Sequence, residues 1–585
     1  MRKEGMRLND KKRFILFSVI YTFLSWFSIR WTAGTSQLKY ILIITIGFLA
    51  IIFWINTYGK NSKKQIKNSK FKFFLYLLLT AGSMLITYRI FSRHSINEPF
   101  VIFFSFIIPT FNVLLFLFFF TAFEWHLAYK KIFLVSNLIL GTGMMIYMPP
   151  GEVPDEQAHI KAAYRVSNKI MHINQNNYYV LRQDEADVAS HDFEKNACFS
   201  IEAYNAYLSE LTSPAKKGKT VEYTLDNMVN AEPFYIVPGI GISIGRIIGL
   251  NAYSTILLGR IFNFIFYTII VYLAFSILPI GQELMLAVTL LPITLQQVIS
   301  FSYDAPLFAF SFLSFSITLH YIYKMKSERF SKKDIIISAV VFLILFNIKS
   351  HAYFLLGLMP MLVILYSYLS EHLSNKTKKI LKICIILTLL LLIFLYIFLY
   401  FNGTITSIKY KPNMIDWGGA IHSQEGYSLM YFLKNPVAVI KLAFYTARYD
   451  FYQYYRQMIG AALGWLDITL PDSLIYIISI LLLFTSFRRE DENVLPLSKN
   501  YSCLILIISL LTVCFVIGGL AIGWTPVTSN VVAGVQGRYF LPVTLFLYIL
   551  LKKIGVTITC KLNQYNLLFC GIVAVFTIQY LIIGL

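Results

Sequence analysis

The chain has 585 residues, of which 57% are hydrophobic and only 14% are charged, and its mean hydropathy is +0.63. A soluble protein of this length could not bury so much apolar surface, so the composition excludes a soluble enzyme and indicates a polytopic membrane protein. The net charge of +21 does not indicate nucleic-acid binding, because most Lys and Arg residues lie in short segments between apolar runs.

Apolar runs of about 20 residues predict the membrane spans in chain order, and hence an all-α fold class. Five spans precede a polar segment at 150–232, six separate it from a second polar segment at 402–472, and four follow. The predicted spans are 14–29, 39–57, 72–92, 100–123, 132–149, 253–277, 284–302, 306–324, 334–349, 351–370, 380–401, 473–488, 500–521, 539–552 and 566–584, about fifteen in all. We expect residues 1–131 to form an accessory N-terminal unit and residues 132–585 the main membrane domain.

Basic connectors predict the orientation of these spans. The positive-inside rule places the N-terminus and these connectors in the cytoplasm: 58–72, 124–131, 324–333, 371–382, 488–500 and 552–563. Both long polar segments and the C-terminus then lie outside. The apolar but Gly- and Pro-rich segment 233–250 would break this alternation as a span, so we expect a lid or an interfacial helix there.

The run MPPGEVPDEQAH at 148–159 places three titratable side chains directly after a predicted span. Asp155 and His159 are four residues apart and would share one helix face. A carboxylate there can remove a proton from an attacking hydroxyl, or bind a divalent cation with Glu156 or His159. The alternative is a well-capped helix at the membrane surface, since Pro and acids favour a first helical turn. The acids further along this loop (Asp184, Glu185, Asp187, Asp192 and Glu194) are expected to form a solvated face.

Two polar groups lie at the predicted outer ends of later spans. Tyr303 and Asp304 follow the 284–302 span and either cap a helix end or line an outer cavity. Lys349 lies in the turn Lys-Ser-His between two spans, against the positive-inside bias. It either snorkels to the headgroups or holds a phosphate.

The sequence GVQGRY at 534–539 enters a span from the outer side. Its glycines allow close backbone approach, and Arg538, flanked by Gln536 and Tyr539, can bind a phosphate through two parallel hydrogen bonds. A flexible loop with an anchoring Arg-Tyr pair is the alternative. Arg260 lies inside a span and needs an anionic partner such as Asp304 or a lipid phosphate, or else a purely structural ion pair.

Aromatic residues are frequent in the second polar segment. The run Tyr449–Arg456 either forms an interfacial aromatic belt or, beside Arg448 and Arg456, stacks on a sugar.

Five ordered motifs together resemble a known family. VPDEQAH, EPFYIVPGIG with GRIIGL and LLGRIFN, LPITLQQVISFSYDA, NIKSHAY and GVQGRYFLP occur in this order. They resemble a bacterial family of multi-pass proteins labelled as a domain of unknown function, which is similar to the GT-C class of membrane glycosyltransferases. The resemblance covers about residues 130–585.

The resemblance implies a helical GT-C-like core with an acidic pair, Asp155 and Glu156, in the first large extracytoplasmic loop. It implies transfer of a sugar from a polyprenyl-phosphate carrier to a glycan or lipid-linked acceptor at the outer face of the bacterial plasma membrane. Asp155 would be the base, with or without Mg²⁺ or Mn²⁺, and no other cofactor is expected. Phosphate binding by Arg538, Gln536 and Lys349 is our inference. A flippase or transporter for lipid-linked sugars, or a scaffold of an envelope assembly complex, are the alternatives.

Overall fold

The computed structural model describes residues 128–581 apart from short gaps. The gaps are 175–177, 192–206, 208, 212, 215–219, 225–231, 325–328, 373, 410–412, 416–423, 493–496 and several positions after 560. The accessory unit and the four spans predicted before residue 124 therefore lie outside the described residues. Within the described part the protein is mostly helical, as expected, with four additional two-stranded ladders.

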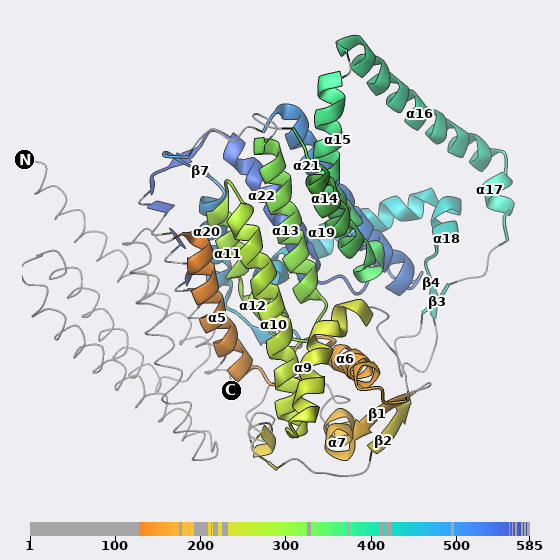
Figure 1. The fold of residues 1–585 in the computed structure, drawn as a ribbon. Helices are drawn as coiled ribbons and strands as arrows, with labels where there is room; N and C mark the ends of the chain where they lie inside the picture. The colour runs from red at the N-terminus through yellow and green to blue at the C-terminus, as the bar shows by residue number, and fades with distance from the viewer. Residues whose placement is uncertain are drawn as a thin grey trace, which may run out of the picture.

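The first half of the described chain builds one side of the bundle (Figure 1). Its elements are α5 (Tyr129–Tyr147), α6 (Glu156–Ile170), β1 (Tyr178–Arg182), α7 (Gln183–His191), β2 (Thr220–Thr224), η2 (Glu232–Tyr235), α9 (Ile236–Ile247), α10 (Ala252–Ile277), α11 (Gln282–Thr289), α12 (Pro292–Val298) and α13 (Asp304–Lys324). Strands β1 and β2 pair antiparallel, with Tyr178 opposite Thr224. The helix predicted near 155–173 is α6.

The second half completes the bundle. Its helices are α14 (Lys332–Asn347), η3 (Lys349–His351), α15 (Phe354–His372), α16 (Asn375–Phe401), α17 (Thr404–Ser407), α18 (Leu429–Lys434), α19 (Pro436–Ile459), α20 (Asp472–Thr485), α21 (Lys499–Trp524), η4 (Gly537–Phe540), α22 (Leu541–Tyr548) and η5 (Ile549–Lys553). Its strands pair as β3 (Asn413–Ile415) with β4 (Gln424–Gly426), β5 (Ala462–Leu463) with β6 (Ile468–Thr469), and β7 (Arg488–Arg489) with β8 (Thr557–Ile558), of which only the last pair is parallel.

Helix α13 lies at the centre of the described bundle and packs against α10, α14, α15 and α22. Its apolar residues are buried almost throughout. Helix α9 packs along α10 where two glycines meet: a Cβ on Gly241 would lie 2.9 Å from the Cα of Gly259. This close approach is possible because neither residue carries a side chain.

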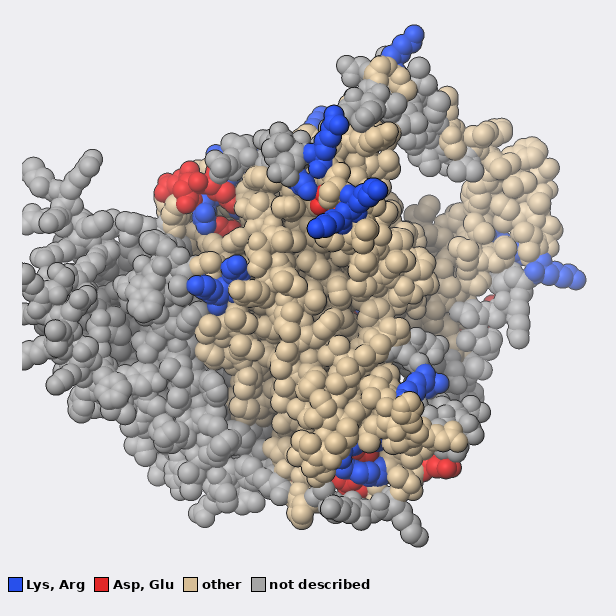
Figure 2. Space-filling view, viewed as in Figure 1, with Lys and Arg blue, Asp and Glu red and all other residues tan. Residues whose placement is uncertain are grey.

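Three of the described helices, α10, α13 and α21, are long and apolar enough to cross a membrane. Figure 2 shows charged side chains mainly towards the two ends of the visible face, with a broad band between them where they are sparse. Both features fit a membrane protein, since the hydrocarbon core excludes charges.

The structure differs from the predicted elements in several segments. The predicted span 539–552 consists of α22, which has eight residues, between the 3-10 helices η4 and η5. The run 284–302 is divided into α11 and α12 because Pro292 begins the second helix and holds Leu291 in an extended conformation. The segment 402–472 is more than a polar loop: it holds α17 to α19 and two hairpins, and α19 alone has 24 residues. Segment 233–250 forms η2 and α9.

Candidate functional site

Arg260 and Glu156 form a fully buried ion pair that fixes the loop between α5 and α6. The guanidinium Nε donates to Glu156 Oε1 at 2.8 Å and Nη2 donates to Oε2 at 2.5 Å. The same guanidinium donates to the carbonyls of Met148 and Pro149. Glu156 also accepts from the backbone N–H groups of Gly151 and Phe301. Both side chains are 0% exposed, so this pair is a structural joint between α10 and the loop.

Asp155, the next residue, has a different environment. Its backbone is left-handed, with φ of 66°, and it precedes α6 without making a side-chain cap hydrogen bond. Its carboxylate is 54% exposed and pairs with Arg538, whose Nη2 lies 2.8 Å from Oδ2. A left-handed non-glycine residue costs about 1–2 kcal/mol. The loop therefore holds this carboxylate in a conformation that the helix start alone does not require.

Arg538 connects this exposed carboxylate to the interior. Its side chain is 5% exposed, and its Nε lies 3.4 Å from Asp304 Oδ2. Its Nη1 donates to Gln297 Oε1 at 3.2 Å and to the Pro154 carbonyl at 3.4 Å. Arg538 is thus held by two carboxylates.

Gly537 lets the segment carrying Arg538 pack directly on α19. A Cβ at this position would lie 2.2 Å from the carbonyl oxygen of Tyr454 and 2.3 Å from the amide nitrogen of Met458. Its own N–H donates to Gln457 Oε1 at 3.0 Å. Gln536 and Tyr539, the two neighbours predicted to help Arg538, are both half-buried. The backbone carbonyl of Gln536 accepts a hydrogen bond from the Tyr539 N–H.

Lys349 is the second cation beside Asp304, and its side chain is mostly buried. Its Nζ lies 2.6 Å from Asp304 Oδ1, a charge contact that is not aligned as a hydrogen bond. The ammonium also lies 3.8 Å from the ring centroid of Tyr539 and 5.2 Å from that of Tyr303. Lys349, Ser350 and His351 all have left-handed backbones, with φ of 48°, 50° and 68°. Such conformations are costly and concentrate at functional sites.

These contacts define a charge chain of Asp155, Arg538, Asp304 and Lys349. All four members were predicted as site residues from separate segments of the sequence. The structure brings them together with Tyr303 and Tyr539. The charges alternate and sum to zero, and only the carboxylate of Asp155 is more than half exposed.

His159 borders the charge chain but is buried. Its Nδ1 lies 2.6 Å from the Tyr235 hydroxyl, and its ring meets Tyr303 edge to face at 4.8 Å. Burial lowers the pKa of His159 from 6.5 to about 4, so the imidazole is neutral at neutral pH. It does not share an open face with Asp155.

Two predicted roles require correction. Arg260 is not available for a phosphate, because Glu156 and two backbone carbonyls occupy its donors. Glu156 does not fit a metal ligand, because Arg260 and two backbone N–H groups occupy both of its oxygens. Among the described residues, no three His, Cys, Asp or Glu side chains form a group that could hold a metal ion.

The acids expected on a solvated face are also buried where the structure describes their side chains. Glu185 is 1% exposed and accepts two hydrogen bonds from Arg246 of α9, at 2.9 and 2.7 Å. Asp184 is buried beside Arg182. The sequence did not predict this ion pair, because Arg246 lies 61 residues away from Glu185.

Sequence reasoning also missed Glu152, although it lies in the same motif as Asp155. Its side chain is 3% exposed. Burial, with Asp467 and Glu156 nearby, raises the pKa of Glu152 from 4.5 to about 8, against the opposing effect of Arg260. The only local signal in the sequence for this site was an acidic residue two positions after Pro149–Pro150.

A second set of ion pairs, which we call the distal cluster (Glu283, Arg489, Glu492 and Lys552), lies at the other end of the bundle. Arg489 pairs with Glu283 at 2.7 Å and Lys552 pairs with Glu492 at 2.8 Å. Arg538 precedes α22 and Lys552 follows it, so the charge chain and the distal cluster lie at opposite ends of that helix.

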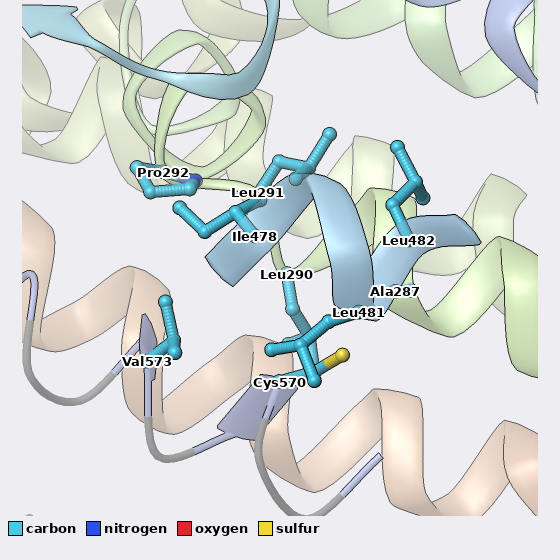
Figure 3. A pocket seen from close by; sticks show the side chains of 9 residues that line it. All are labelled: Ala287, Leu290, Leu291, Pro292, Ile478, Leu481, Leu482, Cys570 and Val573. Carbon is cyan, nitrogen blue, oxygen red and sulfur yellow. The ribbon is translucent and has the colours of Figure 1, made fainter. Parts of the chain in front are cut away.

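Figure 3 shows a small pocket with an apolar lining. Its lining is Ala287, Leu290, Leu291, Pro292, Ile478, Leu481, Leu482, Cys570 and Val573. This apolar lining offers no acid, base or cation for chemistry, so the pocket is not the candidate site.

Sequence comparison agrees with a membrane protein. The family profile described as "Predicted membrane protein (DUF2142)" matches residues 138–547, and the chain belongs to this family. The matched region contains every member of the charge chain. Comparison with curated proteins and with solved structures gives no match.

Proposed function

We propose that the protein is a membrane glycosyltransferase that moves a sugar from a polyprenyl-phosphate carrier to a glycan or lipid-linked acceptor of the cell envelope. The observation that carries this proposal is the charge chain: a half-exposed carboxylate, Asp155, paired with a buried cation. A proton acceptor open to an incoming hydroxyl and cations able to hold a phosphate are the two groups that this reaction needs.

In the proposed step, the acceptor hydroxyl loses its proton to Asp155, and its oxygen attacks the anomeric carbon of the donor sugar. The new C–O bond forms as the bond from that carbon to the phosphate oxygen breaks. The bonding electrons leave with the polyprenyl phosphate, and the simplest stereochemical outcome is inversion.

The pairing of Asp155 with Arg538 links the two halves of this step. When Asp155 takes the proton it loses its negative charge, and its attraction for Arg538 weakens. The guanidinium then becomes available as negative charge develops on the leaving phosphate. Lys349, held against Asp304, would add a second positive charge behind it.

The proposal includes the finer topology: a GT-C-like core at 132–585, about fifteen spans, a cytoplasmic N-terminus and an extracytoplasmic active face in a bacterial plasma membrane. Lys552, in the basic connector 552–563, lies at the opposite end of α22 from Arg538, which supports this orientation.

The test is a mass-spectrometric comparison of envelope polysaccharide from wild-type, deletion and Asp155→Asn strains of the source organism. Loss of the same sugar branch in both mutants, at normal protein levels, is expected. A normal glycan in the Asp155→Asn strain would exclude Asp155 as the base.

The distal cluster favours one alternative, a transporter of lipid-linked sugars. Alternating access uses polar contacts at both ends of a bundle, and Glu283–Arg489 and Lys552–Glu492 provide contacts at the second end. Proteoliposomes separate the two functions. A transporter moves an intact lipid-linked sugar between leaflets without acceptor, whereas the proposed transferase consumes it only when acceptor is present.

A further inference from the structure

Glu152 is a buried carboxyl group that the proposed reaction does not use. It lies in the loop between α5 and α6, three residues before Asp155, and within the described part of the chain its Oε2 has no hydrogen-bond partner. An ionised carboxylate in such a place would lose its hydration without compensation. The protonated form removes that cost, because it carries no net charge.

The charged groups around Glu152 do not neutralise it. Arg260 is the nearby cation, but its donors are occupied by Glu156 and by two backbone carbonyls. Glu156 and Asp467 are both acidic and both raise the pKa of Glu152. Burial, Glu156 of α6 and Asp467 of the β5–β6 hairpin therefore favour a bound proton, and the opposing effect of Arg260 of α10 is smaller.

The hairpin formed by β5 and β6 is docked against this loop. The indole Nε1 of Trp465 donates to the Gly151 carbonyl at 2.6 Å, directly beside Glu152. Gln296 of α12 holds the same turn, accepting from the Gly464 N–H at 2.9 Å and donating to the Gly464 carbonyl at 3.3 Å. The turn also carries Asp467, so docking brings a second carboxylate towards Glu152.

We propose that Glu152 is a proton-binding site, and that its bound proton holds the β5–β6 hairpin onto the loop that presents Asp155. With the proton bound, the hairpin docks over an uncharged group. Without it, Glu152 faces the negative charges of Asp467 and Glu156, and docking is opposed. The inference stands independently of the glycosyltransferase proposal, because its readout is the exposure of the hairpin and not sugar transfer.

The direction of the pH effect follows from the raised pKa of Glu152 in the docked structure. The pKa is about 8 with the hairpin docked, against an ordinary value of 4.5. Docking is therefore strongest below the ordinary value and weakens as the pH rises towards the docked value, where the effect levels off. Between these limits linkage predicts that the docking constant falls as the pH rises.

Hydrogen–deuterium exchange of the full-length protein in lipid nanodiscs tests the proposal. Exchange of segment 462–469 is followed from pH 5 to pH 8 and corrected for the intrinsic pH dependence of amide exchange. In the wild type, protection of this segment should fall as the pH rises. In Glu152→Gln, which carries the uncharged form permanently, protection should stay constant across the range.

Glu425→Gln is the matched control, because Glu425 is an exposed carboxyl on the β3–β4 strand pair, outside the loop that carries Glu152. It should keep the wild-type pH profile. If wild type and Glu152→Gln show the same profile, the proposal is wrong.

Asp467→Asn provides a second test in a protein that keeps Glu152. Removing the neighbouring negative charge should lower the docked pKa of Glu152, so loss of protection should stop at a lower pH than in the wild type. An unchanged profile would overturn the role of Asp467, and with it the proposed coupling between proton and hairpin.

Discussion

Asp155 and Glu156 are neighbours in the sequence, and each pairs with an arginine from a distant segment, yet the two carboxylates differ in burial. The Glu156–Arg260 pair is 0% exposed on both sides, and four backbone groups complete it. The Asp155–Arg538 pair has a buried arginine but a carboxylate that is 54% exposed. The comparison teaches that burial of the acid, and not the presence of an ion pair, separates a structural joint from a candidate reactive group.

The largest expected effect is on the buried pair. Glu156→Gln leaves the Arg260 guanidinium buried without a counter-charge, which should lower the free energy of unfolding by about 3–5 kcal/mol. Denaturant unfolding of the purified protein in detergent measures this. The double variant Glu156→Met with Arg260→Met should lose less than the single variant, since it leaves no buried charge. Equal stability of Glu156→Gln and wild type would remove the structural role.

Arg538→Met should affect both function and stability. It removes the partner of Asp155 and one of two cations beside Asp304, so stability should fall by about 1–3 kcal/mol. The rate of sugar transfer per folded protein should also fall, because the leaving phosphate loses its main cation. Arg538→Lys keeps the charge but loses the planar fork and should recover only part of the rate. Full activity of Arg538→Met would contradict the phosphate role.

Gly537→Ala tests how the segment carrying Arg538 is held. Its Cβ would overlap backbone atoms of Tyr454 and Met458, which cannot move independently of α19, so a loss of about 1–3 kcal/mol is expected. Gly518→Ala in α21 is the control, since its Cβ would meet no atom within 4 Å. Thermal unfolding of both variants should show a lower midpoint for Gly537→Ala alone. Equal midpoints would rule out the packing constraint at Gly537.

The smallest effect on stability is expected from Asp155→Asn. An ion pair with one exposed partner is typically worth about 0–1 kcal/mol. The unfolding transition of this variant should therefore nearly coincide with that of the wild type. A loss comparable to that of Glu156→Gln would place both acids in the structural joint.

Sequence patterns predicted the parts of the fold that depend on local composition. The apolar runs at 253–277, 306–324 and 500–521 correspond to the three described helices that are both long and apolar enough to span a membrane. Sequence patterns did not predict the parts of the fold that depend on tertiary contacts. Helix α19 was missed because its polar and aromatic residues form no continuous apolar run, whereas in the structure it packs on η4 from a distant segment. The break before Pro292 was missed although proline was its local signal.

The candidate site shows the same division. Motif chemistry found Asp155, Asp304, Lys349 and Arg538, because charges beside apolar runs stand out. It could not assign partners: Asp304, a lipid phosphate and a structural ion pair were all left open for Arg260, which pairs with Glu156, 104 residues away. Nor could it foresee the burial of Glu152, since only the folded hairpin brings Trp465 and Asp467 against that loop.

The measurement that tests the central claim most directly is the rate of sugar transfer by purified wild-type and Asp155→Asn protein in nanodiscs. The substrates are a polyprenyl-phosphate sugar and an envelope acceptor, and the rate is normalised to folded protein. We predict a fall of about 10²–10⁴-fold, the usual contribution of a positioned base, with unfolding unchanged. A rate equal to that of the wild type would contradict the account.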